Sequence, residues 1–275
     1  ESYKSNQTII LKIIIKSNFI SNFFNPYIKI ISNEKEEKTF FEHCSKGIRY
    51  IDISSFCGMR NIQLFPINCK ITSSNVEIFD FQDIDIANKK LIVIAPHSDD
   101  AEISSFGLYD SAKESVIVTI TAGEGSCKFC DFESDKESKA RIKGNLRIFN
   151  SLTTGLLGKV RYENSLALGY FNETIKTMYE NKNKLVPSKT AGLLDINYFR
   201  RVKHSNIETN SQPKSNWNSL VTDLEAIIKY TKPDFIVTLH PQIDSNIDHK
   251  YITLALIEAM EALNCKGINL LTVDR

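Results

Sequence analysis

Two apolar runs of this sequence each lead into a loop that is dense in histidine and aspartate. The run Leu91–Ala95 leads into Pro-His-Ser-Asp-Asp-Ala-Glu at 96–102, and the run Phe235–Leu239 leads into a second such loop at 240–249. Three of the five histidines of the chain lie in these two loops. Short apolar runs of this kind are typical of strands that are buried on both faces of a parallel sheet. Because open parallel sheets place their ligand sites at the carboxyl ends of strands, the pattern predicts an α/β fold with a site where the two loops meet.

The sequence after residue 88 alternates between expected strands and expected helices. Strands are expected at Leu91–Ala95, Val116–Thr121 and Phe235–Leu239. Apolar positions with helical spacing predict helices over 135–150, with Ile142, Leu146 and Phe149 inward, over Trp217–Thr231, and over a last segment that ends near Leu263. This alternation predicts a Rossmann-like, mostly parallel sheet with flanking helices over residues 89–275. The final residues resemble a strand that is just beginning, which a chain truncated at its C-terminus would show.

Residues 1–88 form a different kind of sequence. Short runs rich in Ile, Phe and Tyr, such as Tyr27–Ile31 and Ile48–Ile53, are separated by polar turn-like segments. The pattern predicts a small β-rich N-terminal domain. The early apolar run Thr8–Ile15 is interrupted by Lys12 and is too short to span a bilayer, so it indicates a strand and no transmembrane segment is expected.

Between residues 152 and 216 the periodicity fades. A long irregular stretch inside a compact domain is often a substrate-binding loop, an interpretation that we favour over a segment that is merely mobile. The basic cluster Arg200-Arg201-Val-Lys203 could contact a phosphate, but a solvated loop is the favoured interpretation.

Composition limits the class of partner. The 34 basic and 33 acidic residues give a formal net charge of +1, which gives no reason to expect a nucleic-acid partner. Six irregularly spaced cysteines do not form a disulfide framework, and we interpret Cys127 and Cys130 as two incidental thiols. A cytoplasmic protein is expected, either soluble or peripheral at the inner membrane face. The sequence does not predict an oligomeric state.

The two loops carry the residue types of a metal site. Burying carboxylates at a strand end costs several kcal/mol unless a cation compensates them. His97 and Asp100 are three residues apart where a loop enters a helix, and His249 is a natural third ligand. Catalytic zinc sites usually take three such ligands and keep one position open for water, whose pKa falls toward about 7. Zinc is the expected metal, although such sites also accept iron, cobalt or manganese.

The neighbouring residues have separate expected roles. Asp99 is adjacent to the ligands and is expected to act as general base, and Asp248 is expected to hold a histidine or position the substrate. Glu102 has a helix-supporting role and a catalytic role as nearly equal alternatives, and His240 is either catalytic or a plain strand-end residue. His43 and His204 are expected to be structural or solvated. One motif alone could be a helix N-cap, but two of them after strands favour a metal site.

These motifs resemble those of a known family. Ala95–Glu102 resembles the A-H-P-D-D-E signature of the LmbE-like, or PIG-L-type, zinc-dependent de-N-acetylases, and residues 246–249 resemble their later H-x-D-H element. Thr119–Glu124 is similar to the strand and turn that follow the first helix of that family. The resemblance implies removal of the N-acetyl group from an N-acetylhexosamine on a glycolipid, a glycoconjugate or a small thiol precursor. It also implies metal ligation by His97, Asp100 and His249, with Asp99 as base.

The preceding β-rich domain lies outside the minimal fold of that family. It resembles the extra domain of larger bacterial members associated with lipopolysaccharide or surface polysaccharide sugars. The expected substrate is therefore an N-acetylglucosamine-type sugar in such a glycoconjugate.

Two residues depart from the family pattern. Ser98 stands where the family usually has proline, which is a conformational detail. Asn246 stands where the family has a histidine that stabilises the tetrahedral intermediate or protonates the leaving amine. Asparagine can donate a hydrogen bond to an oxyanion but cannot supply a proton at neutral pH. Either His240 replaces that acid, or Asn246 acts as oxyanion donor alone, or activity is weak.

The leading hypothesis is therefore a zinc-dependent deacetylase in which Asp99 deprotonates a metal-bound water that attacks the acetyl carbonyl. The alternatives are a catalytically impaired sugar-binding homologue and a zinc hydrolase of another amide or ester.

Overall fold

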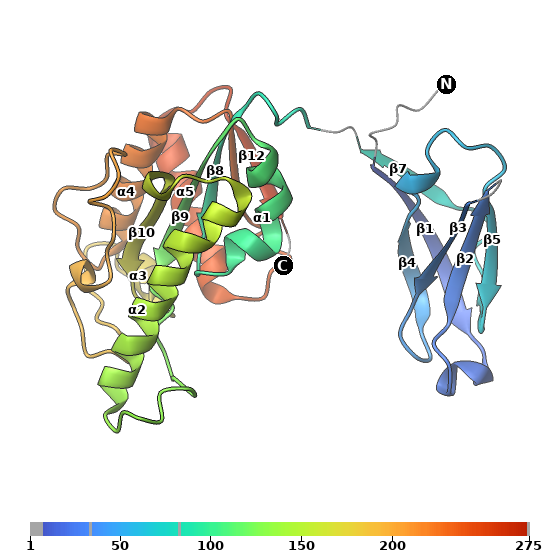
Figure 1. Ribbon diagram of the computed structural model, residues 1–275, viewed down its shortest axis with the longest axis horizontal. Helices are drawn as coiled ribbons and strands as arrows, with labels where there is room; N and C mark the ends of the chain where they lie inside the picture. The colour runs from blue at the N-terminus through green and yellow to red at the C-terminus, as the bar shows by residue number, and fades with distance from the viewer. Residues whose placement is uncertain (1–7, 33–34, 82–83, 274–275) are drawn as a thin grey trace. The chain divides into compact units, whose positions relative to one another are not determined.

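The computed structural model describes residues 8–32, 35–81 and 84–273 of the chain. The chain divides into two compact units, Glu1–Ile84 and Asp85–Arg275 (Figure 1). We call them the N-terminal unit and the C-terminal unit. Within the described parts of the chain, no helix combines the length and the apolar character that crossing a bilayer requires.

The C-terminal unit contains the predicted parallel sheet. Its five strands lie in the order β10-β9-β8-β11-β12, and every neighbouring pair is parallel. Their bounds are β8 (Lys90–Ala95), β9 (Glu114–Thr121), β10 (Ser165–Tyr170), β11 (Phe235–Leu239) and β12 (Asn269–Val273). This confirms the expected α/β class, and β12 is the strand expected at the end of the sequence. The chain proceeds outward from β8 first through β9 and β10 and later through β11 and β12, so the topological switch point lies between β8 and β11.

Helices cover both faces of this sheet (Figure 1). They are α1 (Asp100–Ser111), α2 (Lys136–Thr154), α3 (Ile175–Glu180), α4 (Trp217–Thr231) and α5 (Ile247–Ala262), with short 3-10 turns η3 (Gly155–Gly158), η4 (Tyr162–Asn164) and η5 (Ile196–Tyr198). Leu91 and Val93 of β8 pack in one core with Tyr109 of α1. Ile92 and Ile94 belong to the second core, which includes the buried residues of α4 and α5. The strand is apolar at successive positions because both of its faces are covered.

The predicted inward face of α2 is wrong for Leu146 and Phe149, and only Ile142 of the three predicted residues is partly buried. Leu146 and Phe149 are 44% and 61% exposed, whereas the buried stripe runs through Ala140, Gly144 and Ile148. Two residues of this stripe, Ala140 and Gly144, are small, and the helix packs closely at the glycine: a Cβ on Gly144 would lie 2.5 Å from the ring of Phe199. A large apolar side chain on this helix is therefore not sufficient to mark its buried side, as Leu146 and Phe149 show.

The stretch expected to be irregular contains β10, an edge strand of the parallel sheet. β10 is buried at all six positions and pairs with β9. It is short and contains Gly169 at φ +78°, where a Cβ would lie 2.6 Å from the backbone nitrogen of Arg200. Arg200 itself is only 8% exposed and donates to both carboxylate oxygens of Asp223, at 2.5 and 3.0 Å. The solvated-loop interpretation is therefore wrong for Arg200, whose charge is paired inside the unit.

The N-terminal unit is β-rich, as expected, and contains two antiparallel sheets. One has the order β4-β1-β6, with β7 also paired to β1, and the other has the order β3-β2-β5. The bounds are β1 (Thr8–Ser17), β2 (Tyr27–Ser32), β3 (Lys35–Phe40), β4 (Lys46–Asp52), β5 (Gln63–Ile67), β6 (Cys69–Ile71) and β7 (Glu77–Phe81), with 3-10 turns η1 (Phe19–Asn22) and η2 (Ser54–Phe56). Alternate residues of the strands are buried, and their isoleucines form the core of the unit, including Ile13, Ile15, Ile28, Ile30 and Ile51.

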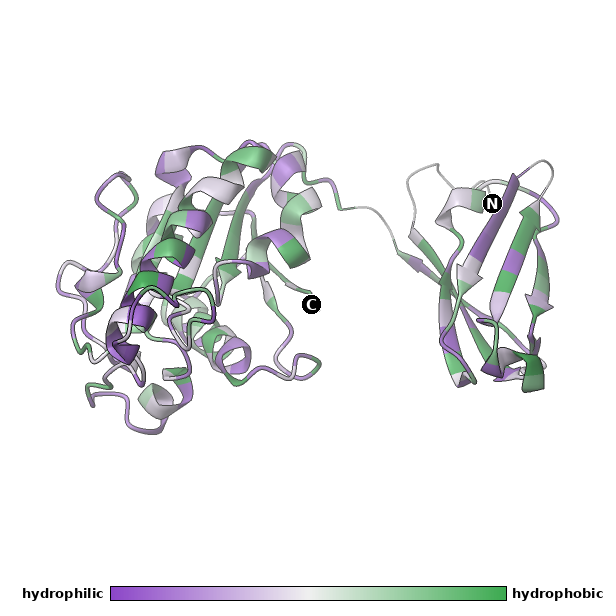
Figure 2. Ribbon diagram, turned by 60° about the horizontal axis from the view of Figure 1, so that its bottom comes forward, coloured by the Kyte–Doolittle hydropathy of each residue, from purple (hydrophilic) through white to green (hydrophobic). Residues whose placement is uncertain are grey.

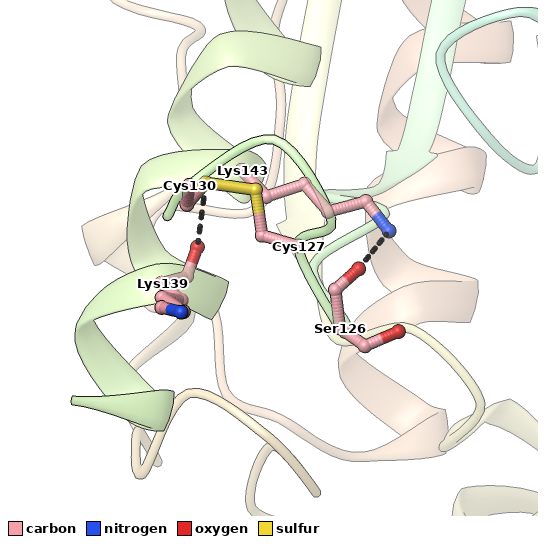
Figure 3. Close-up of a disulfide and its surroundings, with 5 residues drawn as sticks. All are labelled: Ser126, Cys127, Cys130, Lys139 and Lys143. Atoms are coloured by element: carbon pink, nitrogen blue, oxygen red, sulfur yellow. Dashed lines mark hydrogen bonds between the residues drawn. A yellow bond between two sulfur atoms is a disulfide. The ribbon is translucent and has the colours of Figure 1, made fainter. Parts of the chain in front are cut away.

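A disulfide joins Cys127 and Cys130 in the loop between β9 and α2 (Figure 3). The interpretation of these residues as two incidental thiols is therefore wrong. The loop is also held to α2, because Lys143 donates a hydrogen bond to the carbonyl oxygen of Ser126 at 3.2 Å, as drawn in Figure 3.

Candidate metal centre

Three predicted ligands meet at the switch point between β8 and β11. His97 lies in the loop after β8, Asp100 begins α1, and His249 lies in the first turn of α5. The Nδ1 of His97 is 3.1 Å from the Oδ2 of Asp100 and 3.0 Å from the Nε2 of His249, and the last two atoms are 3.2 Å apart. All three residues are buried, with exposed fractions of 7%, 1% and 0%. The carboxyl ends of two adjacent parallel strands therefore bring one carboxylate and two imidazoles to a common point.

A carboxylate lies behind each of the two imidazoles. The Nδ1 of His249 is 2.6 Å from the Oδ2 of Asp244, and the Nε2 of His97 is 3.7 Å from the Oδ2 of Asp248. When the outer nitrogen of a ring donates to a carboxylate, the inner nitrogen keeps its lone pair for a metal. His249 is thus oriented with its Nε2 toward Asp100, and the ring of His97 lies between the carboxylates of Asp100 and Asp248. Asp248, which is expected from the sequence to hold a histidine or the substrate, lies beside His97.

The charges of the cluster favour a bound cation. Burial by itself would lower the pKa of His97, but the carboxylates of Asp100 and Asp248 outweigh it and raise that pKa to about 9. Burial by itself would raise the pKa of Asp100, but the imidazoles of His249 and His97 hold it well below its usual range. The carboxylate therefore stays ionised in a buried place where only positive charge stabilises it.

The donor set fits a divalent transition metal. Tetrahedral ligands held about 2.0–2.1 Å from one ion lie about 3.3 Å from one another, close to the 3.0–3.2 Å found here. Nitrogen and carboxylate oxygen donors suit zinc and its neighbours in the first transition row. His97, Asp100 and His249 supply the ligand atoms that would hold it.

Asp99 lies next to the ligands but has a different environment. Its side chain is 41% exposed, and its Oδ1 accepts a hydrogen bond from the Nη2 of Arg147 at 2.9 Å. Arg147, on α2, reaches Asp99 across Gly123, which has a φ of +61°. A Cβ at this glycine would lie 2.4 Å from the Nε of Arg147. Sequence reasoning missed the arginine, since its role depends on α2 crossing the turn after β9.

Glu124 adds a buried carboxyl group after β9. It is 1% exposed and accepts hydrogen bonds from the backbone nitrogen of Asn172 and from the hydroxyl of Ser188. Burial raises its pKa to about 7, and the nearby charge of Asp248 adds to the shift. Asp248 in turn accepts a 2.6 Å hydrogen bond from the backbone nitrogen of Glu173. Through these hydrogen bonds, Glu124 and Asp248 fix the loop after β10 beside the cluster.

The sequence of the C-terminal unit matches the model of a known protein family. The model described as PIG-L, GlcNAc-PI de-N-acetylase, matches residues 92–260. The chain belongs to the PIG-L family. The matched range contains both loops and all three ligands of the cluster, and it confirms the resemblance found in the sequence. A comparison with curated proteins gave no match. PIG-L membership indicates a de-N-acetylase or a related hydrolase, and proteins of the family are typically metal-dependent.

The residue expected from the sequence to depart from the family pattern, Asn246, lies at the start of α5. Asn246 is the N-cap of this helix, and its Oδ1 accepts a hydrogen bond from the backbone nitrogen of Asp248 at 2.9 Å. Its own backbone nitrogen donates to Asp244, which fixes the carboxylate behind His249. Sequence reasoning gave Asp244 no role, although its place five residues before His249 in the same loop was a usable signal.

The other candidate residues have local partners. His240 accepts from the backbone nitrogens of Gln242 and Ile243 through its Nδ1, at 3.2 and 3.3 Å. Glu102 accepts a 3.5 Å hydrogen bond from the hydroxyl of Tyr109 within α1. The remaining two histidines contact backbone carbonyls of their own units, His43 with Ser21 and His204 with Ser165.

Proposed function

We propose that the C-terminal unit is a metal-dependent hydrolase that removes the N-acetyl group from an N-acetylglucosamine-type sugar in a glycoconjugate. The observation that carries this proposal is the buried cluster of His97, Asp100 and His249 at the switch point of a PIG-L fold. Residues 89–275 would form the hydrolase and residues 1–88 a separate β-rich domain. A glycolipid or surface polysaccharide is the substrate class that we favour, and a cytoplasmic location at the inner membrane face would suit it.

The cluster would hold the metal, and Asp99 would act as the base. A zinc ion, or another divalent ion, held by the three ligands would acidify a water and polarise the acetyl carbonyl. Asp99 is adjacent in sequence to Asp100 and its carboxylate is partly exposed, so it can accept a proton at the edge of the cluster. Arg147 holds this carboxylate in place. Hydrolysis forms a carbon–oxygen bond and breaks the amide carbon–nitrogen bond, and the proton accepted by Asp99 can be returned to the leaving amine.

Asn246 and His240 are the proposed partners for the oxyanion and the leaving group. The Oδ1 of Asn246 is used in the helix cap, so its Nδ2 is the donor that would face an oxyanion. The Nδ1 of His240 accepts backbone hydrogen bonds, so its Nε2–H would donate a hydrogen bond to the leaving nitrogen, while the proton that this nitrogen takes up is the one held by Asp99. Asp248 would orient His97.

The test is an acetate-release assay on N-acetylglucosamine glycoconjugates with zinc-loaded protein, together with metal analysis. His249→Ala should lose both metal and turnover, whereas Asp99→Ala should keep the metal and lose at least a hundredfold in kcat. His43→Ala in the N-terminal unit is the matched control and should behave as the wild type. Full activity in either of the first two variants would overturn the assignment.

Asn246 favours one second candidate, a sugar-binding homologue with impaired catalysis. This candidate predicts binding of N-acetylated sugars without release of acetate, and no gain of turnover in Asn246→His. Release of a different acid from another amide or ester would instead point to a related hydrolase with a different substrate.

A further inference from the structure

One end of the N-terminal unit exposes a group of large apolar side chains. Phe19, Phe23 and Phe24 are 77%, 69% and 66% exposed, and Ile20 is 50% exposed. We call these four residues the aromatic tip. They belong to η1 and the connection from β1 to β2, and no charged residue occurs from Ser17 to Ile28. Figure 2 shows hydrophobic residues in green in this short turn, at the lower end of the unit in that view.

The backbone of the aromatic tip is held firmly from within the unit. Asn18 caps η1 by accepting from the backbone nitrogen of Ile20, and its own backbone nitrogen donates to the carbonyl of Asn68. The hydroxyl of Ser21 donates to Asn18, and His43 contacts the carbonyl of Ser21 at 2.8 Å. Polar side chains such as those of Asn18 and Ser21 are thus used to fix the turn, and the four apolar side chains of the aromatic tip are exposed. A rigid apolar protrusion of this kind is expected at a binding surface.

Three lysines lie side by side next to the aromatic tip. In the sheet of β4, β1 and β6, Lys16 is directly opposite Lys46 on one side and Lys70 on the other. We call them the lysine row. Residues directly opposite in antiparallel strands project from the same face, and like charges placed so are destabilising. All three are exposed, and no ion pair within the described part of the chain involves them. Lys16 is three residues before Phe19, so the lysine row borders the aromatic tip.

The connections at this end contain little negative charge. The segment 41–45 contributes Glu42, which is paired with Arg49 of β4. The connection from β1 to β2 and the one at Asn68 contain no acidic residue. An uncharged apolar protrusion bordered by a row of cations matches the two layers of an anionic bilayer surface, where headgroups surround an apolar interior.

We propose that this end of the N-terminal unit docks on an anionic lipid surface. The aromatic tip enters the boundary between headgroups and acyl chains, and the lysine row lies at the level of the anionic headgroups. Phenylalanine and isoleucine side chains gain from leaving water but offer no hydrogen bonds to a sugar, which argues for lipid over a soluble glycan. The proposal is independent of the catalytic chemistry of the C-terminal unit.

The test is cosedimentation of the full chain with vesicles of phosphatidylcholine alone or with about one third phosphatidylglycerol. The wild type should bind the anionic vesicles, more weakly as salt rises, and the neutral ones far less. Phe23→Ser with Phe24→Ser should weaken binding more than tenfold. Replacing the lysine row by glutamine should weaken it about a hundredfold, since each lysine near such a surface adds roughly fivefold.

Matched variants of the C-terminal unit control for general loss of apolar surface or charge. Phe132→Ser removes a phenylalanine that is 79% exposed, and Lys184→Gln, Lys189→Gln and Lys229→Gln remove three exposed lysines; neither change should alter binding. Equal binding to both kinds of vesicle, no binding to either, or unchanged binding in the Phe23/Phe24 variant would overturn the proposal. Retention of this unit by a soluble glycan or a protein instead of vesicles would do so as well.

Insertion itself can be observed with a reporter. Phe24→Trp adds a second tryptophan to Trp217, which is fully buried in the other unit and gives a constant background. The emission of the tryptophan introduced by Phe24→Trp should shift to the blue with anionic vesicles and be quenched by lipids brominated in the acyl chain. Blue-shifted emission without acyl-chain quenching would show adsorption only and would contradict insertion.

Discussion

The Nδ1 of His249 lies 2.6 Å from the Oδ2 of Asp244, and the other carboxylate oxygen of Asp244 accepts from the backbone nitrogen of Asn246. This carboxylate therefore both fixes the tautomer of a metal ligand and is fixed by the turn that begins α5. Asp244→Asn should lower metal affinity by roughly 10-fold to 100-fold, because the amide has one acceptor oxygen for two donors and lacks the negative charge that raises the basicity of the ring. Competition with a chelating dye measures this.

Asp195→Asn is the control for this prediction. Asp195 also caps a turn of the same unit, accepting from the backbone nitrogen of Asn197, but it has no contact with the cluster. Its variant should bind metal as the wild type does. Wild-type metal affinity in Asp244→Asn would show that His249 is oriented by packing alone.

Gly123 and Gly125 form a second matched pair. Gly123→Ala places a Cβ 2.4 Å from the Nε of Arg147 at a φ of +61°, whereas the nearest atom to a Cβ on Gly125 is the Nζ of Lys143 at 3.5 Å. Gly123→Ala should displace Arg147 from Asp99 and lower kcat at least tenfold with metal affinity unchanged, besides costing about 1 kcal/mol of stability. Gly125→Ala should leave kcat near that of the wild type.

A substitution of Arg147 distinguishes a role in positioning Asp99 from a role in stabilising the fold. If Arg147 acts by holding Asp99, Arg147→Met should reproduce the loss of kcat while KM and the free energy of unfolding change little. Equal activity in the two glycine variants would show that the contact between Arg147 and Asp99 is dispensable.

The parts of the fold that depend on local pattern are predictable from the sequence. Apolar runs are sufficient to locate β8, β9 and β11, and the convergence of His97, Asp100 and His249 follows because the carboxyl ends of neighbouring parallel strands meet. β10 is not predictable from an apolar run, because its sequence contains Gly169 and small residues. Its burial comes from packing against Arg200 and α2. The prediction for the buried face of α2 is wrong for the same reason, since close packing selects Gly144 over larger apolar residues.

The residues that surround the three ligands are brought there by tertiary packing. Arg147 reaches Asp99 from a helix 48 residues later in the chain, and Glu124 is fixed by Asn172 and Ser188. None of these contacts has a spacing that could be recognised in one sequence. Asp244 is the exception, because it lies in the same loop as the histidine that it orients.

Glu124 should make stability depend on pH in a defined direction. Burial raises its pKa from the ordinary value of 4.5 to about 7, so between these values the unfolded chain binds fewer protons than the folded chain. The stability from this group is therefore fully present at low pH and is lost as pH rises toward 7. Between pH 5 and 7.5 the loss should be about 2 kcal/mol.

Glu124→Gln removes this titration and should remove the same part of the pH dependence. Urea unfolding of the metal-free protein, followed by the fluorescence of the buried Trp217, reports on the C-terminal unit. An unchanged difference between the two pH values in Glu124→Gln would show that this carboxyl group is already ionised in the folded protein at low pH.

Metal binding should release a proton from His97. In the metal-free cluster, Asp100 and Asp248 outweigh burial and raise the pKa of this imidazole to about 9, so the ring is charged at neutral pH. A metal binds only the neutral ring, so affinity should rise roughly tenfold per pH unit from 7 toward 9. Calorimetry at pH 7 in buffers of different ionisation enthalpy should show about one proton released per ion bound. Asp248→Asn removes one of the two carboxylates and should lower the pH at which this release ends, whereas heats that do not vary with buffer would mean that His97 is already neutral.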